Sequence, residues 1–419
     1  KEASVEFSID VETQFTGYEK SSDTATVVAL IKDKSSIYEL AEGETAALVL
    51  DRTPFYAESG GQSYDTGIIY NDACTLEVLE VSKIQNVFVH KVLCVKGVLS
   101  VGDEVNCHIS EQRRNSTARN HTATHLLHKA LRIVLGEHVH QAGSSVTADA
   151  LRFDFNHFEA MTKDQIEEVE EIVNSKIGLF LPVQTEELTM DEAVKKGITA
   201  LFGEKYGNIV RAVSVGGFSS ELCGGTHVFN SGQIGAFKIV SESGVASGVR
   251  RIEAVTGAGV LNRANEAERI LAEVSEILKT NHSGLIKKAV NVSEENKILK
   301  REVESLKKST LSDAVGNMIA EAKDFNDVKL VAKSFTGLEI DDLRSLSDDI
   351  KANYAAVVIV LATVNDGKVT FIVSVTDDLL DKGYHAGNMV KQIAAAAGGG
   401  GGGKADMAQA GAKDPGRLD

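Results

Sequence analysis

The sequence is poor in proline and cysteine and has no long apolar run. Among its 419 residues only 3 are proline and 4 are cysteine, namely Cys74, Cys94, Cys107 and Cys223. Four cysteines in a chain of this length do not make a disulfide framework, so we expect a protein of the reducing cytoplasm. No stretch of about 18 consecutive apolar residues is present, which excludes a membrane-spanning helix.

The start of the chain lacks both a methionine and a leader. The first residue is Lys1, and no charged segment followed by an apolar one comes after it. A secretory leader has that pattern. We therefore expect the chain to be a piece of a longer protein.

Basic residues are also in deficit. The 44 Lys and Arg residues stand against 60 Asp and Glu residues, which gives a formal net charge of −16. An acidic surface repels phosphate, so a protein that covers nucleic acid with most of its surface is excluded unless basic residues cluster locally. The 43% of hydrophobic residues is typical of a globular chain and excludes fibrous and wholly disordered proteins. At about 150 residues per domain, the length predicts two to four domains.

Hydrophobic periodicity divides the chain into four parts and predicts a multidomain α+β and α/β protein. Residues 1–110 contain short Val-, Ile- and Leu-rich runs between Gly, Asp and Asn turns, which predicts a small β-barrel, with a sandwich as the alternative. Residues 111–257 mix helical and strand patterns and predict an α+β domain. Residues 258–312 predict an antiparallel helical hairpin, and residues 313–419 predict an α/β domain.

The expected hairpin carries apolar residues at heptad spacing on both arms. Leu271 and Val274 belong to the first arm, and Leu299 and Val303 belong to the second. Steps of four and three residues place such side chains along one seam of a coiled coil, with Asn296 on the seam fixing register or partner number. The pattern predicts a seam between the two arms and self-association of the chain.

Two pairs of potential metal ligands share one spacing. His121 and His125 lie one turn apart in a helix expected over 111–135, so both side chains project from one face. Cys223 and His227 repeat the spacing in a glycine-rich connector. Three imidazoles and one thiolate form the tetrahedral set that zinc prefers. Four protein ligands suit a structural metal, whereas a catalytic zinc normally keeps one position open, so both roles stay possible.

The glycine run at the C-terminal end has two interpretations. Gly398–Gly403 ends an expected helix and precedes Lys404. Glycine-rich segments are commonly flexible linkers, yet bare amides after a helix also offer a phosphate site. Basic pairs such as Arg250-Arg251 are likewise either solvated surface or phosphate contacts.

Several segments, taken together, resemble alanyl-tRNA synthetase. They are Pro54-Phe55-Tyr56-Ala57-Glu58-Ser59-Gly60-Gly61-Gln62, Arg119-Asn120 with the HxxxH helix, Leu151–Phe155, Glu221–His227, Gly248–Ala254, and the final glycine run with Asp406–Gly411. The resemblance covers nearly the whole chain in order. It does not include the N-terminal half of that family, which holds the ATP-dependent site for alanine ligation. Tyr64 and Lys404-Ala405 depart from the family pattern, which has a small residue and Arg-Pro there.

The resemblance implies an editing domain over residues 1–257 that hydrolyses mischarged tRNA(Ala), chiefly the seryl and also the glycyl ester. It implies an oligomerising helical segment and a C-terminal domain that binds the tRNA elbow. By position in the family motifs, the expected zinc ligands are His121, His125, Cys223 and His227. The expected editing-site residues are Gln141 and Thr53, the latter recognising the serine hydroxyl. The expected tRNA contacts are Arg250, Arg251 and Lys404.

Physical chemistry favours such a second, hydrolytic site. An apolar pocket that accepts alanine rejects an added hydroxyl only ~10²-fold. A site that requires the hydroxyl discriminates harder, because an unpaired buried polar group costs roughly 1–3 kcal/mol. Glutamine orients but does not titrate, which leaves a hydroxide at the metal, a tRNA hydroxyl or water as the base. Two other functions fit the same motifs: a free-standing trans-editing deacylase and a non-catalytic, zinc-stabilised RNA-binding module.

Overall fold

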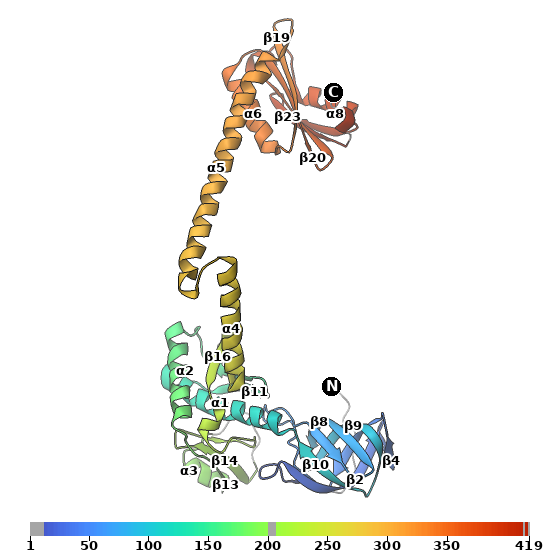
Figure 1. Cartoon of the computed structure of the whole chain (residues 1–419), viewed down its shortest axis with the longest axis vertical. Helices are drawn as coiled ribbons and strands as arrows, with labels where there is room; N and C mark the ends of the chain where they lie inside the picture. Colours follow the sequence, from blue (N-terminus) through green and yellow to red (C-terminus); the bar gives the residue numbers. More distant parts are fainter. Residues whose placement is uncertain (1–11, 200–206, 414, 418–419) are drawn as a thin grey trace. The chain divides into compact units, whose positions relative to one another are not determined.

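A computed structural model describes residues 12–199, 207–413 and 415–417 (Figure 1). The chain divides into two compact units, Lys1–Leu271 and Ala272–Asp419. The outermost ends of the first and last predicted domains, residues 1–11 and 418–419, lie outside the described residues. None of the helices in the described part of the chain combines the length and the apolar character that a membrane span requires.

The first unit begins with a closed antiparallel barrel. Six strands follow one another in the order β10–β7–β8–β9–β5–β2, and pairing of β2 with β10 closes the ring. Their bounds are β2 Ser22–Lys32, β5 Thr45–Leu50, β7 Gly67–Tyr70, β8 Cys74–Ile84, β9 Val87–Ser100 and β10 Glu104–Ile109, and the short strands are β1 Gln14–Phe15, β3 Ser35–Ile37, β4 Glu39–Ala41 and β6 Arg52–Thr53. Alternate side chains such as Leu48, Leu76 and Val92 fill the interior, because successive strand residues face opposite sides. The predicted small barrel is confirmed.

The rest of the first unit is an α+β structure in which one long helix packs on a sheet. Its elements are α1 Glu111–Leu135, β11 Gln141–Val146, β12 Leu151–Asn156, α2 Lys163–Gly178, β13 Val183–Thr189, α3 Met190–Lys195, β14 Ile209–Val215, β15 Ser219–Leu222, η1 Ser231–Ile234, β16 Phe237–Ala246 and β17 Val249–Thr256. The strands form two antiparallel sheets, β11–β12–β17–β16 and β13–β14–β15. Leu126 and Leu127 of α1 share a core with Phe153 and Phe155 of β12. This packing fixes the rotation of α1 and thus the direction of its other face.

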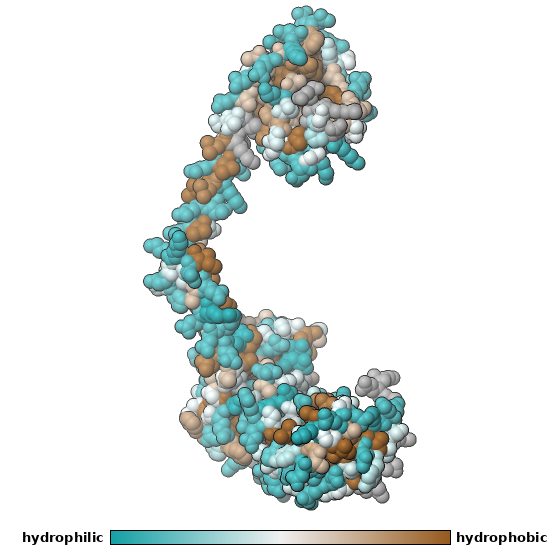
Figure 2. Space-filling model, turned by 45° about the vertical axis from the view of Figure 1, so that its right-hand side comes forward, coloured by the Kyte–Doolittle hydropathy of each residue, from teal (hydrophilic) through white to brown (hydrophobic). Residues whose placement is uncertain are grey.

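Two helices follow the α+β part. They are α4, Ala258–Ile277, and α5, Leu285–Ala320, with a short turn and η2, His282–Gly284, before α5. Leu271 and Val274 of α4 are 47% and 38% exposed, and Leu299 and Val303 of α5 are 58% and 53% exposed. The seam between the two arms stays a prediction. Figure 2 shows brown, apolar side chains on the surface of these helices. A heptad pattern places apolar residues in a stripe on each helix, but it does not specify what covers the stripe.

The second unit contains a six-stranded sheet covered on both faces. The helix predicted near residues 313–322 is the end of α5, and the later elements are β18 Lys323–Phe325, β19 Val328–Thr336, α6 Ile340–Asn353, β20 Val357–Asn365, β21 Lys368–Val375, α7 Asp377–Leu380, α8 Ala386–Ala396, β22 Gly400–Gly403, β23 Met407–Ala412 and η3 Pro415–Arg417. The strand order is β18–β19–β20–β21–β23–β22. Ile359 and Leu361 of β20 pack with Leu346 of α6, whereas Val358 packs with Val390 of α8. The predicted α/β character is confirmed.

The glycine run forms a strand at the edge of this sheet. Gly400–Gly403 is β22, and it pairs antiparallel with β23. A Cβ atom at Gly401 would lie 2.4 Å from Cα of Ala410, so a side chain there would collide with the neighbouring strand. Glycine at this position permits the close approach of the two strands. The flexible-linker interpretation is therefore wrong, and phosphate binding stays a prediction.

Candidate metal centre

The two predicted ligand pairs meet in the first unit. One donor atom each from His121, His125, Cys223 and His227 lies within 4.8 Å of the others. Sγ of Cys223 is 3.4 Å from Nε2 of His121 and 3.3 Å from Nε2 of His227. In a tetrahedral zinc site, with Zn–S about 2.3 Å and Zn–N about 2.0 Å, ligand atoms lie about 3.5 Å apart. The donor set therefore fits a metal ion of this kind.

Local structure explains why the loop that carries Cys223 and His227 reaches helix α1. Cys223 and His227 follow β15, and Nη1 of Arg211 on β14 donates to the carbonyl oxygens of Cys223 at 2.8 Å and Gly225 at 3.0 Å. A Cβ atom at Gly225 would lie 2.1 Å from Cε1 of His121. Only glycine allows the loop backbone to approach the ligand imidazole this closely.

Two of the imidazoles are held in the tautomer that binds metal through Nε2. Nδ1 of His121 lies 2.7 Å from Oε1 of Gln62, and an amide oxygen can only accept, so this Nδ1 carries the proton. The hydroxyl of Thr122 donates to the Ala118 carbonyl at 2.9 Å and therefore accepts from Nδ1 of His227 at 3.0 Å. The Nε2 lone pairs of both rings are left for a metal, the usual arrangement behind ligand histidines.

Burial keeps the ligand imidazoles neutral. Burial, together with a smaller effect of the neighbouring His125, lowers the pKa of His121 to about 3. Burial also lowers the pKa of His125 and takes the pKa of His227 well below its ordinary value. Neutral imidazole is the form that coordinates metals, so all three rings are ready to bind at neutral pH.

The buried carboxylate of Glu221 lies near His125, the third ligand imidazole. Oε2 of Glu221 lies 3.8 Å from Nδ1 of His125, and its Oε1 lies 3.1 Å from Nδ1 of His128. Burial alone would raise the pKa of Glu221, but the interactions with His125 and His128 outweigh it and the pKa is lowered. At 3.8 Å the carboxylate is too far from Nδ1 of His125 for a hydrogen bond, so it acts on this ring only through its charge.

A cavity of about 420 Å³ opens directly beside the cluster. Its lining includes three of the ligands, His121, His125 and Cys223, and also Gln141 and Thr124. A cavity of this size accepts a small organic group. Gln141 thus shares the cavity with three of the ligands, and its role in editing stays a prediction. Thr124 was not among the predicted site residues, although it follows His121 by three residues on the same helix face.

Comparison with known proteins gives matches along most of the chain. The family model "tRNA synthetases class II (A)" matches residues 1–113, "Threonyl and Alanyl tRNA synthetase second additional domain" matches residues 210–253, and "DHHA1 domain" matches residues 327–419. The alanine–tRNA ligase of Acetivibrio thermocellus is 47% identical over 410 residues, 98% of this chain and 47% of the relative. That of Pseudomonas fluorescens is 48% identical over 412 residues, with the same coverage. Almost the whole of this chain is therefore similar to alanyl-tRNA synthetases.

The chain corresponds to the C-terminal part of alanyl-tRNA synthetases and spans about half the length of the curated relatives it matches. The second family model covers the loop with Cys223 and His227. A solved structure, the C-Ala domain of Aquifex aeolicus alanyl-tRNA synthetase, is 29% identical over 23% of this chain and 86% of that chain, with a TM-score of 0.22. A TM-score this low does not establish a common overall fold.

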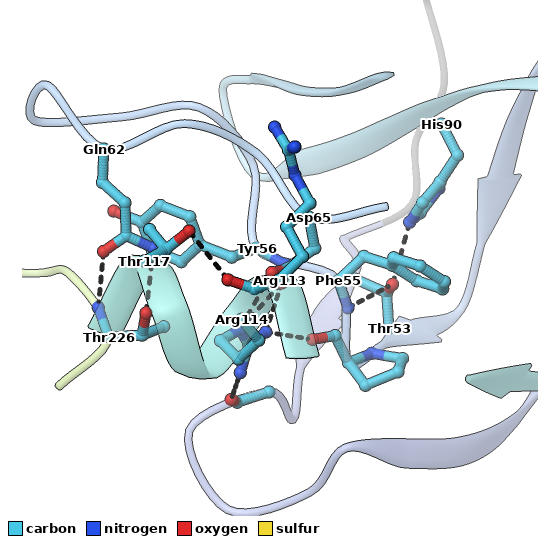
Figure 3. Close-up of polar contacts among 12 residues, drawn as sticks. Thr53, Phe55, Tyr56, Gln62, Asp65, His90, Arg113, Arg114, Thr117 and Thr226 are labelled. Carbon is cyan, nitrogen blue, oxygen red and sulfur yellow. Dashed lines mark hydrogen bonds and ion pairs between the residues drawn. The ribbon is translucent and has the colours of Figure 1, made fainter. Parts of the chain in front are cut away.

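Thr53 is not brought to the metal centre. Its side chain is 0% exposed inside the barrel, and it is not among the described residues that line the cavity. Figure 3 shows its hydroxyl directed at His90, with Nε2 at 2.8 Å, and the hydroxyl also accepts from the amide of Phe55 at 3.2 Å. The position gives no support to the expected role of Thr53 in substrate recognition, because both hydrogen bonds of the hydroxyl are internal.

The two arginines expected to contact tRNA are engaged within the first unit. Arg250 makes two hydrogen bonds to Glu242, at 2.5 and 2.7 Å, and Arg251 makes two to Asp154, at 2.7 and 2.8 Å. Such paired contacts bind the guanidinium groups to neighbouring strands of the sheet. Both side chains are thus already paired within the sheet, and their contact with tRNA stays a prediction. Lys404 is exposed in the second unit, between β22 and β23.

Proposed function

We propose that this chain removes wrongly attached amino acids from tRNA(Ala), chiefly serine and also glycine. In this reaction water adds to the ester carbonyl and the bond to the terminal ribose oxygen breaks, which releases the free amino acid and a tRNA with its hydroxyl restored. One observation carries the proposal: four converging metal donors border a cavity that also contains Gln141 and Thr124. The relatives are named for alanine ligation, and we attribute ligation to a part of the longer protein that this chain does not include.

The chain's own residues would bind and orient the ester. His121, His125, Cys223 and His227 would hold zinc, which when bound supplies a Lewis acid that polarises a carbonyl and acidifies water. The amide of Gln141 both donates and accepts, so it can orient water or the ester without taking a proton. The hydroxyl of Thr124 donates to the helix carbonyl of Asn120 at 2.9 Å. Its oxygen can then accept from a substrate donor such as the serine hydroxyl or the ammonium group.

Serine release from Ser-tRNA(Ala) tests the proposal. The wild-type chain should release serine, and Cys223→Ala and Gln141→Ala should release it at least tenfold more slowly. Ala-tRNA(Ala) is the control substrate and should stay charged. Equal rates for the wild type and Cys223→Ala would remove the metal centre from the mechanism.

A second candidate is a non-catalytic module in which zinc is structural. It is favoured by the donor set itself, because four protein ligands fill a tetrahedral shell. This candidate predicts binding of tRNA(Ala) with no release of serine from Ser-tRNA(Ala). The same assay therefore decides between the two functions.

We propose tRNA(Ala) and a second copy of the chain as partners, with the cytoplasm as the location. Lys404 is exposed beside the glycine strand, and its ammonium group suits a phosphate of the tRNA. Leu299, Val303 and Leu306 on α5 are 58%, 53% and 66% exposed, which favours burial against another helix. Sedimentation at the mass of one chain at high concentration would contradict self-association.

A further inference from the structure

We infer that Gln62, a barrel residue, positions the metal centre by orienting His121 and by tying the loop that carries Cys223 and His227 to the same point. The inference rests on the proposal that these residues hold a metal ion. Gln62 belongs to the turn Ser59-Gly60-Gly61-Gln62, which leads back into the barrel before β7. It is far in sequence from both elements that supply ligands.

The side chain of Gln62 is buried and bonded to both of those elements. It is 0% exposed. Its Oε1 accepts from Nδ1 of His121 at 2.7 Å and from the amide of Thr226 at 2.8 Å. Its Nε2 donates to the hydroxyl of Thr226 at 2.9 Å, and Figure 3 shows Gln62 and Thr226 facing each other. Thr226 directly precedes His227, so one amide group connects α1 with the ligand loop.

The backbone of the turn is anchored to the α+β part at two places. The amide of Val146 donates to the carbonyl of Gly61 at 2.7 Å, and the amide of Ser63 donates to the carbonyl of Val146 at 2.9 Å. Val146 ends β11, the strand that begins with Gln141. The turn is thus held beside the cavity by backbone bonds that a change in the Gln62 side chain leaves in place.

Gln62 acts through His121. Among the described residues it is not part of the cavity lining, whereas His121 is. Without the acceptor at Nδ1, the His121 ring can rotate or exchange tautomers, and its Nε2 lone pair is no longer held toward Cys223. Loss of such a partner typically lowers metal affinity 10–100-fold. We therefore class Gln62 as a positioning residue.

Zinc affinity of the full chain tests this role without any tRNA. Gln62→Met keeps the length and volume of the side chain but cannot accept from Nδ1, so its zinc dissociation constant, measured by competition with a chelator, should rise 10–100-fold. Gln62→Glu retains an acceptor oxygen and should recover most of the affinity. Gln141→Met changes a cavity residue that the structure gives no bond to a ligand, and it should bind zinc as the wild type does.

Melting temperatures with and without zinc separate positioning from simple packing. For Gln62→Met, the increase in melting temperature caused by zinc should be smaller. A tenfold larger zinc dissociation constant removes about 1.4 kcal/mol of the stabilisation that zinc provides. An unchanged zinc dissociation constant, with equal losses of stability in metal-free and loaded protein, would overturn the inference. If Gln62→Met does not fold, Gln62→Asn, which is too short to reach Nδ1, takes its place. Absence of serine release by the wild type would refute the proposed function and leave this result intact.

Discussion

The hydroxyl of Thr53 lies 2.8 Å from Nε2 of His90 in the interior of the barrel. Nδ1 of His90 lies 3.2 Å from the carbonyl oxygen of Leu48, which can only accept, so Nδ1 carries the proton. Nε2 therefore accepts from the Thr53 hydroxyl. Both side chains are 0% exposed, and this pair connects the end of the short strand β6 with β9.

The replacement Thr53→Val should destabilise the barrel without slowing the release of serine. Valine keeps the shape of the side chain but leaves Nε2 of His90 buried and unpaired, which costs roughly 1–3 kcal/mol. Urea denaturation should show this loss, and serine release per folded molecule should stay within about twofold of the wild type. Normal stability combined with slower release of serine but not glycine would instead support the recognition role expected from the sequence.

His90 should make the stability of the chain depend on pH. Burial lowers the pKa of His90 from 6.5 to about 4. The unfolded chain takes up a proton below about pH 6.5 while the folded chain does not, so this stability is complete above pH 6.5 and falls as the pH drops toward 4. Between pH 7 and pH 5 the loss should be about 2 kcal/mol. Urea midpoints at both values should fall less for His90→Gln, which can make similar hydrogen bonds without titrating; equal falls would contradict the assignment.

The ion pair between Arg114 and Asp65 should be a large contributor to the docking of α1 on the barrel. Nε of Arg114 lies 3.0 Å from both carboxylate oxygens of Asp65, and Nη1 and Nη2 donate to the carbonyls of Gly17 at 2.6 Å and Pro54 at 2.9 Å (Figure 3). The two side chains are 11% and 5% exposed. Arg114→Met leaves a buried carboxylate without its partner, and we expect a loss of about 3 kcal/mol in urea denaturation.

A surface pair supplies the control for that experiment. Nε of Arg52 lies 3.4 Å from Oδ2 of Asp51, and the two side chains are 45% and 35% exposed. Arg52→Met should cost less than about 1 kcal/mol, since exposed ion pairs are weak. Similar losses for Arg114→Met and Arg52→Met would show that burial of the Arg114 pair does not matter.

The edge strand of glycines should tolerate alanine at one position and reject it at the next. A Cβ atom at Gly401 would lie 2.4 Å from Cα of Ala410, whereas a Cβ atom at Gly400 would meet nothing within 4 Å. Gly401→Ala should therefore destabilise β22 and β23 by about 1–3 kcal/mol. Faster amide hydrogen exchange in these two strands would reveal it, with Gly400→Ala as the unaffected control. Equal exchange in both variants would contradict the pairing of β22 with β23.

Local pattern alone predicted much of this protein. The bounds of α1 follow from its 3.6-residue periodicity, and the helical spacing of His121 and His125 places both rings on one face. The barrel strands and the covered strand β20 follow from short apolar runs between turn residues. The equal spacing of Cys223 and His227 was enough to suggest a shared metal. These features depend on residues within a few positions of one another.

Other features were decided by contacts between distant residues, which local pattern does not contain. Gln62 meets Thr226 across 164 positions, and Arg251 meets Asp154 across 97. The apolar stripes on α4 and α5 are exposed, since heptad spacing does not specify what covers them. Thr53 is an internal hydrogen-bonding group because β6 places it under β9. Side-chain chemistry and helical spacing supplied the ligands, but only the packing of α1, the barrel turn and the loop after β15 arranged them around one point.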